Sequence, residues 1–326
     1  MRTGDGALTK TQAATAYRKL ILARLAEEKI REEYFNDEMK TPVHLSVGQE
    51  AIPVGVCAAL PPGFKTFGTY RNHALYLAVT DDTVGFFEEI YGRMGGPGKG
   101  KAGSMHLAAP DKGFIASSAI VGTTIPVAVG AALAESYRKS DSVVAVFFGE
   151  GAVDEGAFWE SLNFAALRKL RVLFVCEDNG LAIHAHAKDR QGYDSMLRAV
   201  RAFRCHADEG DGCDLAEVFA KTRGIVGRMD EDPKPGFLRL TYLRSLEHVG
   251  VREDFDAGYR SKPPSRELKA LDPVQRFEAY LLKRGRKRAE LDEVRHAVQN
   301  EIDRSVESAR KSRFPGPEEL FTDVHA

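Results

Sequence analysis

The sequence has few of the features that mark a secreted or membrane-bound protein. Its four cysteines, Cys57, Cys176, Cys205 and Cys213, form no C-x-x-C pair, which fits a reducing compartment better than a disulfide framework. No run reaches the roughly 20 apolar residues that a membrane-spanning helix needs. Residues 1–10 also lack the apolar core of a signal peptide. We therefore expect a cytoplasmic protein.

The sequence also lacks an excess of positive or negative charge. The 46 basic and 47 acidic residues leave a formal net charge of -1, whereas nucleic-acid and membrane-surface binders usually carry a basic excess or stripe. The basic residues of 281–313 alternate with acidic ones, which is typical of a solvated helix rather than a nucleic-acid-binding arm. Neither class of partner is indicated.

Two short apolar runs predict buried strands. Residues 143–148 (VVAVFF) and 172–176 (VLFVC) are too short for helices, and a helical pattern over 157–170 separates them. A strand-helix-strand order indicates a parallel βαβ unit with a right-handed crossover. We therefore predict an α/β fold with a doubly wound, mainly parallel sheet and helices on both faces, with a later strand at 237–243.

The remaining segments are assigned around this sheet. A long helix is expected over 11–35, with Leu22, Leu25 and Ala26 facing inward and Glu27, Glu28, Lys29 and Arg31 facing water. We expect a tightly packed helix within 43–60, a deeply packed small-residue helix over 125–137, a loop over 244–266, and a charged helix with a tail at the end. The predicted organisation is an N-terminal helical arm (1–40), an α/β domain (41–265), and a C-terminal helix and tail packed on that domain (266–326).

A cluster of glycines lies between these elements, at positions 92, 95, 96, 98, 100 and 103. So many glycines in one segment predict irregular backbone. Such a segment is either a flexible loop or a place where the backbone closely approaches a ligand.

Oxygen-bearing side chains follow both of the predicted buried strands. Gly149-Glu150-Gly151 comes directly after the first strand, and Glu177-Asp178-Asn179 ends the second. Open α/β sheets bind ligands at the carboxyl ends of their strands. Either segment alone is usually only a turn, but the joint pattern predicts a site for a phosphate group. A carboxylate, an amide oxygen and a backbone carbonyl, together with diphosphate oxygens, would suit magnesium.

Residues 149–179 resemble the thiamine-diphosphate motif of the alpha subunits of 2-oxo acid dehydrogenases, the pyruvate, branched-chain and acetoin dehydrogenase family. The similarity extends over about 44–260. It includes HLSVGQEA (44–51), FGTYRNH (67–73), GKGKAGSMH (98–106) and IVGTTIPVAVGAALA (120–134).

The resemblance implies roles for individual residues. Glu150, Asn179 and the backbone carbonyl of Leu181 would bind Mg²⁺. The cofactor thiamine diphosphate would be held by Tyr70, Arg71, Ala119, Val121, Gly151, Ala152 and Arg244. Val121 would bend the cofactor so that its amino group lies over the reactive carbon. The family's active-site histidine corresponds to His248. His44 and His73 are further candidates for lining the pocket and taking part in catalysis, and His184 and His186 could touch the substrate.

The resemblance also implies partners and a reaction. The chain shows no residue that would activate the pyrimidine ring, which a glutamate of the beta subunit does in this family. An α2β2 heterotetramer is therefore expected, with 43–60 and 125–133 as candidate interface segments or, alternatively, core. The expected reaction decarboxylates a 2-oxo acid and passes the acyl group to a lipoyl partner.

Departures from the family pattern keep alternatives open. Leu246 stands where the family has a histidine, and Val249 stands in place of the regulatory serine. Acyl transfer to a carbonyl acceptor without lipoamide therefore remains an alternative, as does a non-catalytic assembly subunit. The substrate is also open, because Glu150 is typical of branched-chain members, whereas His73 and residues 120–122 favour pyruvate.

Overall fold

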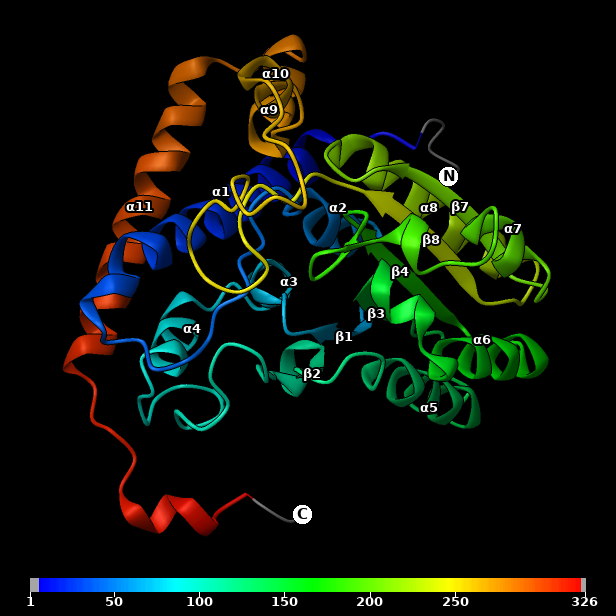
Figure 1. The fold of residues 1–326 in the computed structure, drawn as a ribbon, viewed down its shortest axis with the longest axis horizontal. Coiled ribbons are helices and arrows are strands. Elements are labelled where there is room, and N and C mark those ends of the chain that lie inside the picture. Colours follow the sequence, from blue (N-terminus) through cyan, green and yellow to red (C-terminus); the bar gives the residue numbers. More distant parts are fainter. Residues whose placement is uncertain (1–5, 324–326) are drawn as a thin grey trace.

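A parallel sheet forms the centre of the protein (Figure 1); the structure is a computed structural model that describes residues 6–323. Within this range, six strands lie in the order β2-β1-β3-β4-β8-β7. Every neighbouring pair is parallel, which confirms the predicted sheet. The strands are β1 (Lys65–Thr69), β2 (Phe114–Ser118), β3 (Val144–Gly149), β4 (Val172–Asp178), β7 (His206–Asp211) and β8 (Gly236–Thr241).

Alternate residues of the central strands supply two separate cores. Ala145 and Phe147 of β3 join one core, while Val144, Val146 and Phe148 join the other. Successive side chains of a strand point to opposite faces, so a strand covered on both faces needs a continuous apolar run. This is the reason that VVAVFF and VLFVC were recognisable as strands.

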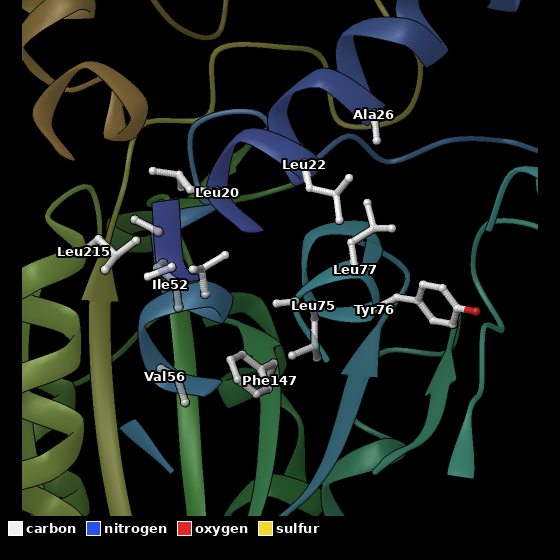
Figure 2. Packing of buried hydrophobic residues seen from close by; sticks show 14 of the residues in the cluster. Leu20, Leu22, Ala26, Ile52, Val56, Leu75, Tyr76, Leu77, Phe147 and Leu215 are labelled. Atoms are coloured by element: carbon white, nitrogen blue, oxygen red, sulfur yellow. The ribbon is translucent and has the colours of Figure 1, made fainter. Parts of the chain in front are cut away.

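The larger core lies between the sheet and the long helices. Figure 2 shows side chains of α1, α2 and α3 above Phe147 of β3, among them Leu22, Ile52 and Leu77. Burial on this scale stabilises the fold by roughly 1.5–3 kcal/mol for each large apolar side chain. The helices in this layer are α1 (Lys10–Glu33), α2 (Ala51–Ala59), α3 (His73–Thr80), α4 (Thr83–Ile90), α8 (Leu215–Glu231), α10 (Pro273–Lys283) and α11 (Arg288–Lys311).

The opposite face of the sheet is covered by α5 (Thr124–Tyr137), α6 (Gly156–Arg168) and α7 (Met196–Arg201), as Figure 1 shows for α5 and α6. Helix α5 was expected to be packed deeply. Its Ile125, Ala128 and Ala132 are buried, but Val127 and Tyr137 on its other face are exposed. The prediction was therefore wrong for half of this helix, because small apolar residues all round a helix do not reveal which side meets the sheet.

One local prediction for the first 60 residues is wrong and another is confirmed. Glu27 does not face water: it is fully buried and accepts a hydrogen bond from the Ser46 backbone N–H. The tightly packed helix expected within 43–60 is α2, which begins at Ala51. Gly48 precedes it with φ +99°, and a Cβ atom there would lie 2.4 Å from the Leu243 carbonyl oxygen, so only glycine fits.

Short elements connect the layers. A hairpin of β5 (Leu181–Ala182) and β6 (Ala185–His186) follows β4, and the predicted loop leads from β8 to α9 (Ser265–Ala270). None of the helices in 6–323 is both long and apolar enough to cross a membrane. The 3-10 helices are η1 (Tyr34–Asn36), η2 (Pro110–Lys112), η3 (Glu150–Asp154), η4 (Ala187–Asp189) and η5 (Pro317–Phe321).

The glycine-rich segment after α4 is wrapped around a side chain of its own subunit. The buried carboxylate of Glu89 accepts hydrogen bonds from the backbone N–H groups of Gly98, Gly100, Ala102 and Gly103, at 2.7 to 3.1 Å. The irregular backbone was predicted correctly. The irregular backbone encloses the Glu89 carboxylate, and this contact explains the glycines without a flexible loop or a ligand.

Candidate functional site

A cavity of about 310 Å³ lies at the carboxyl ends of the central strands. It lies where β1 is followed along the chain by β2 on one side, while β3 is followed by β4 on the other. Such switch points are where open α/β sheets bind ligands. The lining consists of Gln49, Thr69, Tyr70, Arg71, Val121, Gly149, Glu150, Gly151, Ala152, Asp154, Glu155, Glu177, Asn179, Leu181, Ala182, Ile183, Tyr242 and His248.

The cavity brings together most of the site residues predicted from sequence. Those in its lining are Tyr70, Arg71, Val121, Glu150, Gly151, Ala152, Asn179, Leu181 and His248. They come from five places in the chain, and the sheet register explains part of the convergence. Gly149 pairs with Glu177 across β3 and β4, so Glu150 and Asn179 leave neighbouring strands at the same edge.

The Asn179 amide has one satisfied and one unsatisfied end. Its Nδ2 donates to the Tyr242 hydroxyl at 3.0 Å. Its Oδ1 is buried and has no hydrogen-bond partner among residues 6–323. A buried acceptor without a partner costs roughly 1–3 kcal/mol. A cation bound at this oxygen would remove that cost.

The Glu150 carboxylate is also buried at the cavity wall, with only 1% of the residue exposed. Burial, together with the nearby Asp178, raises the pKa of Glu150 to about 7, and Arg190 opposes this shift. Arg190 Nη2 lies 2.7 Å from Glu150 Oε1. Asp178 itself turns away and binds Arg239 Nε at 2.6 Å. Asp178 is therefore not part of the cavity lining.

The donor set fits a magnesium ion that is shared with a ligand. No group of three or more His, Cys, Asp or Glu side chains within the described ranges could hold a metal alone. The predicted set of one carboxylate, one amide oxygen and one backbone carbonyl leaves Mg²⁺ short of its usual six oxygen ligands. Phosphate oxygens could supply the rest.

The charge of the lining supports the same reading. Four carboxylates, those of Glu150, Asp154, Glu155 and Glu177, face one arginine, Arg71, among the lining residues that the structure describes. Glu177 is buried, and burial raises its pKa to about 8, so it is neutral at pH 7. Arg190 offsets the charge of Glu150 and Asp154, so the lining has little positive charge left for a diphosphate, and a divalent cation entering with it would supply that charge.

Glycine and arginine shape the end of the cavity predicted to hold the diphosphate. A Cβ atom at Gly151 would lie 2.8 Å from the Ala182 Cβ atom, so a side chain would not fit there. Arg71 donates to the backbone oxygens of Leu45 (2.7 Å) and His248 (2.9 Å). Arg71 therefore positions the loop that carries His248 and also lines the cavity.

Three aromatic rings pack together at one side of the cavity. The His44 ring centroid lies 4.4 Å from that of Tyr70 and 5.2 Å from that of His248. Burial and the charge of Arg71 lower the pKa of His248 to about 4 and that of His44 to about 3. Both imidazoles are therefore neutral near pH 7 and can accept a proton or a hydrogen bond. His44 is not part of the cavity lining, but its ring packs against Tyr70 and His248, which are.

Three other predicted site residues also lie outside the cavity lining. His73 is fully buried between Glu27 (Nδ1–Oε2, 3.2 Å) and Ser104 (Nε2–Oγ, 2.6 Å), so the prediction that it lines the pocket is wrong. Arg244 points away, donating to the Leu246 and Ile183 carbonyls and the Tyr259 hydroxyl. Ala119 lies two residues before Val121, just after β2.

His184 and His186 contact the loop that follows β8 and do not line the cavity. The His184 ring packs on Tyr259, with ring centroids 4.5 Å apart. His186 Nε2 lies 2.9 Å from the Tyr259 carbonyl oxygen. The predicted substrate contact of these two histidines is therefore not supported. They join the β5–β6 hairpin to the loop that carries His248.

Several lining residues were not predicted. Gln49 Nε2 donates to Glu177 Oε1 at 3.2 Å, and Tyr242 contacts Asn179. Glu177 immediately precedes Asp178 at the predicted strand end, and the alternation of faces could have raised it as a candidate. Gln49 and Tyr242 gave no such signal, since nothing in their own segments indicates that they meet β4.

Comparison with known proteins gives a consistent result. The family described as "Dehydrogenase E1 component" matches residues 18–318. The acetoin:2,6-dichlorophenolindophenol oxidoreductase alpha subunit of Bacillus subtilis is 33% identical, over 98% of this chain and 95% of its own length. The pyruvate dehydrogenase E1 component alpha subunit of Rhizobium meliloti is 31% identical, over 97% of this chain and 90% of its own length.

Proposed function

This chain belongs to the dehydrogenase E1 component family, and on that premise we propose that it is the alpha subunit of a thiamine-diphosphate-dependent 2-oxo acid dehydrogenase. The observation that carries the proposal is the meeting of Glu150 with the unsatisfied Asn179 Oδ1 at one cavity wall. Arg71, Tyr70 and His248 complete the same cavity.

The cofactor and the chain divide the chemistry between them. Thiamine diphosphate, when bound, supplies a carbon nucleophile for the keto carbon of a 2-oxo acid and a sink for the electrons left by CO2. The chain holds the diphosphate end, through the turn at Gly151 and Ala152. His248, a neutral imidazole on a loop positioned by Arg71, is placed to accept a hydrogen bond or a proton in the cavity.

We propose Mg²⁺ as the ion that joins the diphosphate to the protein. Glu150, Asn179 Oδ1 and the Leu181 carbonyl would be its protein ligands. The lining supports this assignment, because among its described residues it offers a diphosphate one arginine, Arg71, and a divalent cation would supply the further positive charge.

A beta subunit is the partner implied by the alpha-subunit names of both relatives. The apolar surface beside the cavity supports its location. Ile120, Val121 and Val127 are exposed at the start of α5, and Val121 also lines the cavity. Such a surface is unfavourable in water and typical of an interface core. We propose an α2β2 assembly in which the beta subunit covers this surface, whereas residues 51–56 of α2 are buried within this chain.

Cofactor binding tests this proposal directly. Full-length chain, purified together with its beta partner, is titrated calorimetrically with thiamine diphosphate at several Mg²⁺ concentrations. Glu150→Ala should weaken binding by more than about tenfold at limiting Mg²⁺, because a charged oxygen ligand is lost. Glu160→Ala, at an exposed position of α6, serves as the matched control. Wild-type protein that bound no thiamine diphosphate would contradict the proposed function.

The acyl acceptor is tested by a second assay. Release of CO2 from candidate 2-oxo acids is measured with and without a lipoylated partner. We propose transfer to the lipoyl group, and a rate that requires the lipoylated partner supports it. The buried Leu246 in place of a family histidine is the observation behind the alternative of a carbonyl acceptor. Turnover that never depends on the lipoyl partner would favour that alternative.

A further inference from the structure

Arg190 lies outside the motif that marks the candidate metal site, yet its side chain reaches that site. It follows η4, in the turn after the β5–β6 hairpin, and its side chain is largely buried (15% exposed). Its Nη2 lies 2.7 Å from Glu150 Oε1, and its Nη1 pairs with Asp154. The Arg190 Nε donates to the Ala185 carbonyl at 3.2 Å. The guanidinium is thus fixed by three groups, one of them the candidate metal ligand.

The other side-chain ligand candidate is held in the same manner. Asn179 Nδ2 donates to the Tyr242 hydroxyl at 3.0 Å, which fixes the amide and leaves its Oδ1 without a partner in 6–323. Arg190 likewise engages one carboxylate oxygen of Glu150, Oε1, so the second can serve a metal ion. Each ligand candidate therefore has one atom tied to a neighbour and one oxygen available.

We propose that Arg190 is a positioning residue for the metal ion: it orients the Glu150 carboxylate, as Tyr242 orients the Asn179 amide. The inference rests on the proposed function, because it concerns the same Mg²⁺ site. Partners that hold metal ligands typically change metal affinity by about 10–100-fold when they are removed. Arginine suits the task because its rigid fork can hold two carboxylates, here Glu150 and Asp154, in a fixed geometry.

The charge of Arg190 allows an opposite role, which makes the test decisive. A guanidinium beside Glu150 could instead occupy the place of the metal and compete with it. Removing a competitor would strengthen Mg²⁺ binding, whereas removing a positioning residue weakens it. The sign of the change in Mg²⁺ affinity separates the two roles.

The experiment uses full-length chain purified with its beta partner. Thiamine diphosphate binding is measured by calorimetry over a series of Mg²⁺ concentrations. Arg190→Gln should raise the Mg²⁺ concentration for half-maximal binding by about 10–100-fold, while cofactor affinity at saturating Mg²⁺ changes little. Arg190→Lys should recover part of the effect, and Tyr242→Phe should shift the Mg²⁺ requirement in the same direction. Arg198→Gln, which removes an exposed ion pair with Asp194, is the matched control.

Three possible results would contradict the positioning role, and they differ in what they imply for the proposed function. An unchanged or lower Mg²⁺ requirement in Arg190→Gln would overturn the positioning role, while the proposed function would stand. A loss of cofactor affinity that is equal at all Mg²⁺ concentrations would also overturn it, since it would indicate a direct contact with the cofactor. Wild-type protein that binds no cofactor overturns both proposals, so the two failures are distinguishable.

Discussion

Two segments of this chain have glycines close to a buried glutamate but differ in what they enclose. The loop after α4 surrounds Glu89, whose carboxylate receives four backbone N–H groups. The turn after β3 lies instead at a cavity where Asn179 Oδ1 has no partner within residues 6–323. The hydrogen-bonding groups of the loop after α4 are paired within the chain, whereas the turn after β3 lies beside an acceptor that a ligand could use. Glycine content therefore indicates a close approach of the backbone, but it does not show whether the neighbour is a side chain of the same protein or a ligand.

Two buried glutamates extend the comparison. Glu89 has the four donors of its loop, whereas Glu177 receives one side-chain hydrogen bond, from Gln49 at 3.2 Å. The single donor does not compensate for burial, which raises the pKa of Glu177 to about 8. The structural loop thus surrounds Glu89 with backbone donors, while the cavity leaves Glu177 with a single donor and disfavours its ionised form.

The largest expected effect is in the loop after α4. Glu89→Gln should lower the free energy of unfolding by about 3 kcal/mol or more, because the amide NH2 group would face two of the four N–H donors. Urea unfolding of the cofactor-free protein measures this. Glu160→Gln, on an exposed glutamate of α6, should change stability by less than about 0.5 kcal/mol. Equal stability of the two variants would show that the loop does not depend on Glu89.

A change at the cavity beside the turn after β3 should act on binding more than on folding. Asn179→Ala removes one hydrogen bond to Tyr242, so the cofactor-free protein should lose only about 1 kcal/mol of unfolding free energy. The same variant should need more than about tenfold more Mg²⁺ to bind thiamine diphosphate. Urea unfolding and calorimetry together check both. A large loss of stability with normal binding would make Asn179 structural, like Glu89.

The third expected effect is a pH dependence of stability. The raised pKa of Glu177 means that the folded protein keeps a proton that the unfolded protein has released. This group's contribution to stability is complete below about pH 4.5 and is lost as pH rises towards 8. Glu177→Gln cannot titrate, so its unfolding free energy should fall less steeply over this range, by up to about 1.4 kcal/mol per pH unit. Identical slopes for variant and wild type would contradict the assigned pKa.

The sequence predicted those parts of the fold whose signal is local. Strands β3 and β4 were recognisable because each is covered on both faces and therefore continuously apolar. Strands β1, β2 and β7 were not predicted. All three include polar residues, and β2 and β7 also form the two edges of the sheet. The residues of β7, HADEGD, are only partly buried, and their sequence carries little hydrophobic signal.

The site was predictable where motif residues come directly after these strands. Glu150 and Asn179 follow from strand order alone, because parallel strands bring their carboxyl ends to one edge. Arg190 and Tyr242 were missed, since their importance depends on contacts across 40 and 63 positions of sequence. Glu27 was assigned to the surface and His73 to the pocket for the same reason, because neither residue shows in the sequence that the other is its buried partner.

We expect a metal-linked diphosphate at the turn after β3 and none in the loop after α4. A crystal structure of the chain with its beta partner, grown with Mg²⁺ and thiamine diphosphate, tests this most directly. We predict an ion in contact with Glu150, Asn179 Oδ1 and the Leu181 carbonyl, with Glu89 still enclosed by its loop. A diphosphate bound by the loop over residues 92–103, or a cavity whose Glu150 and Asn179 contact neither ion nor cofactor, would contradict it.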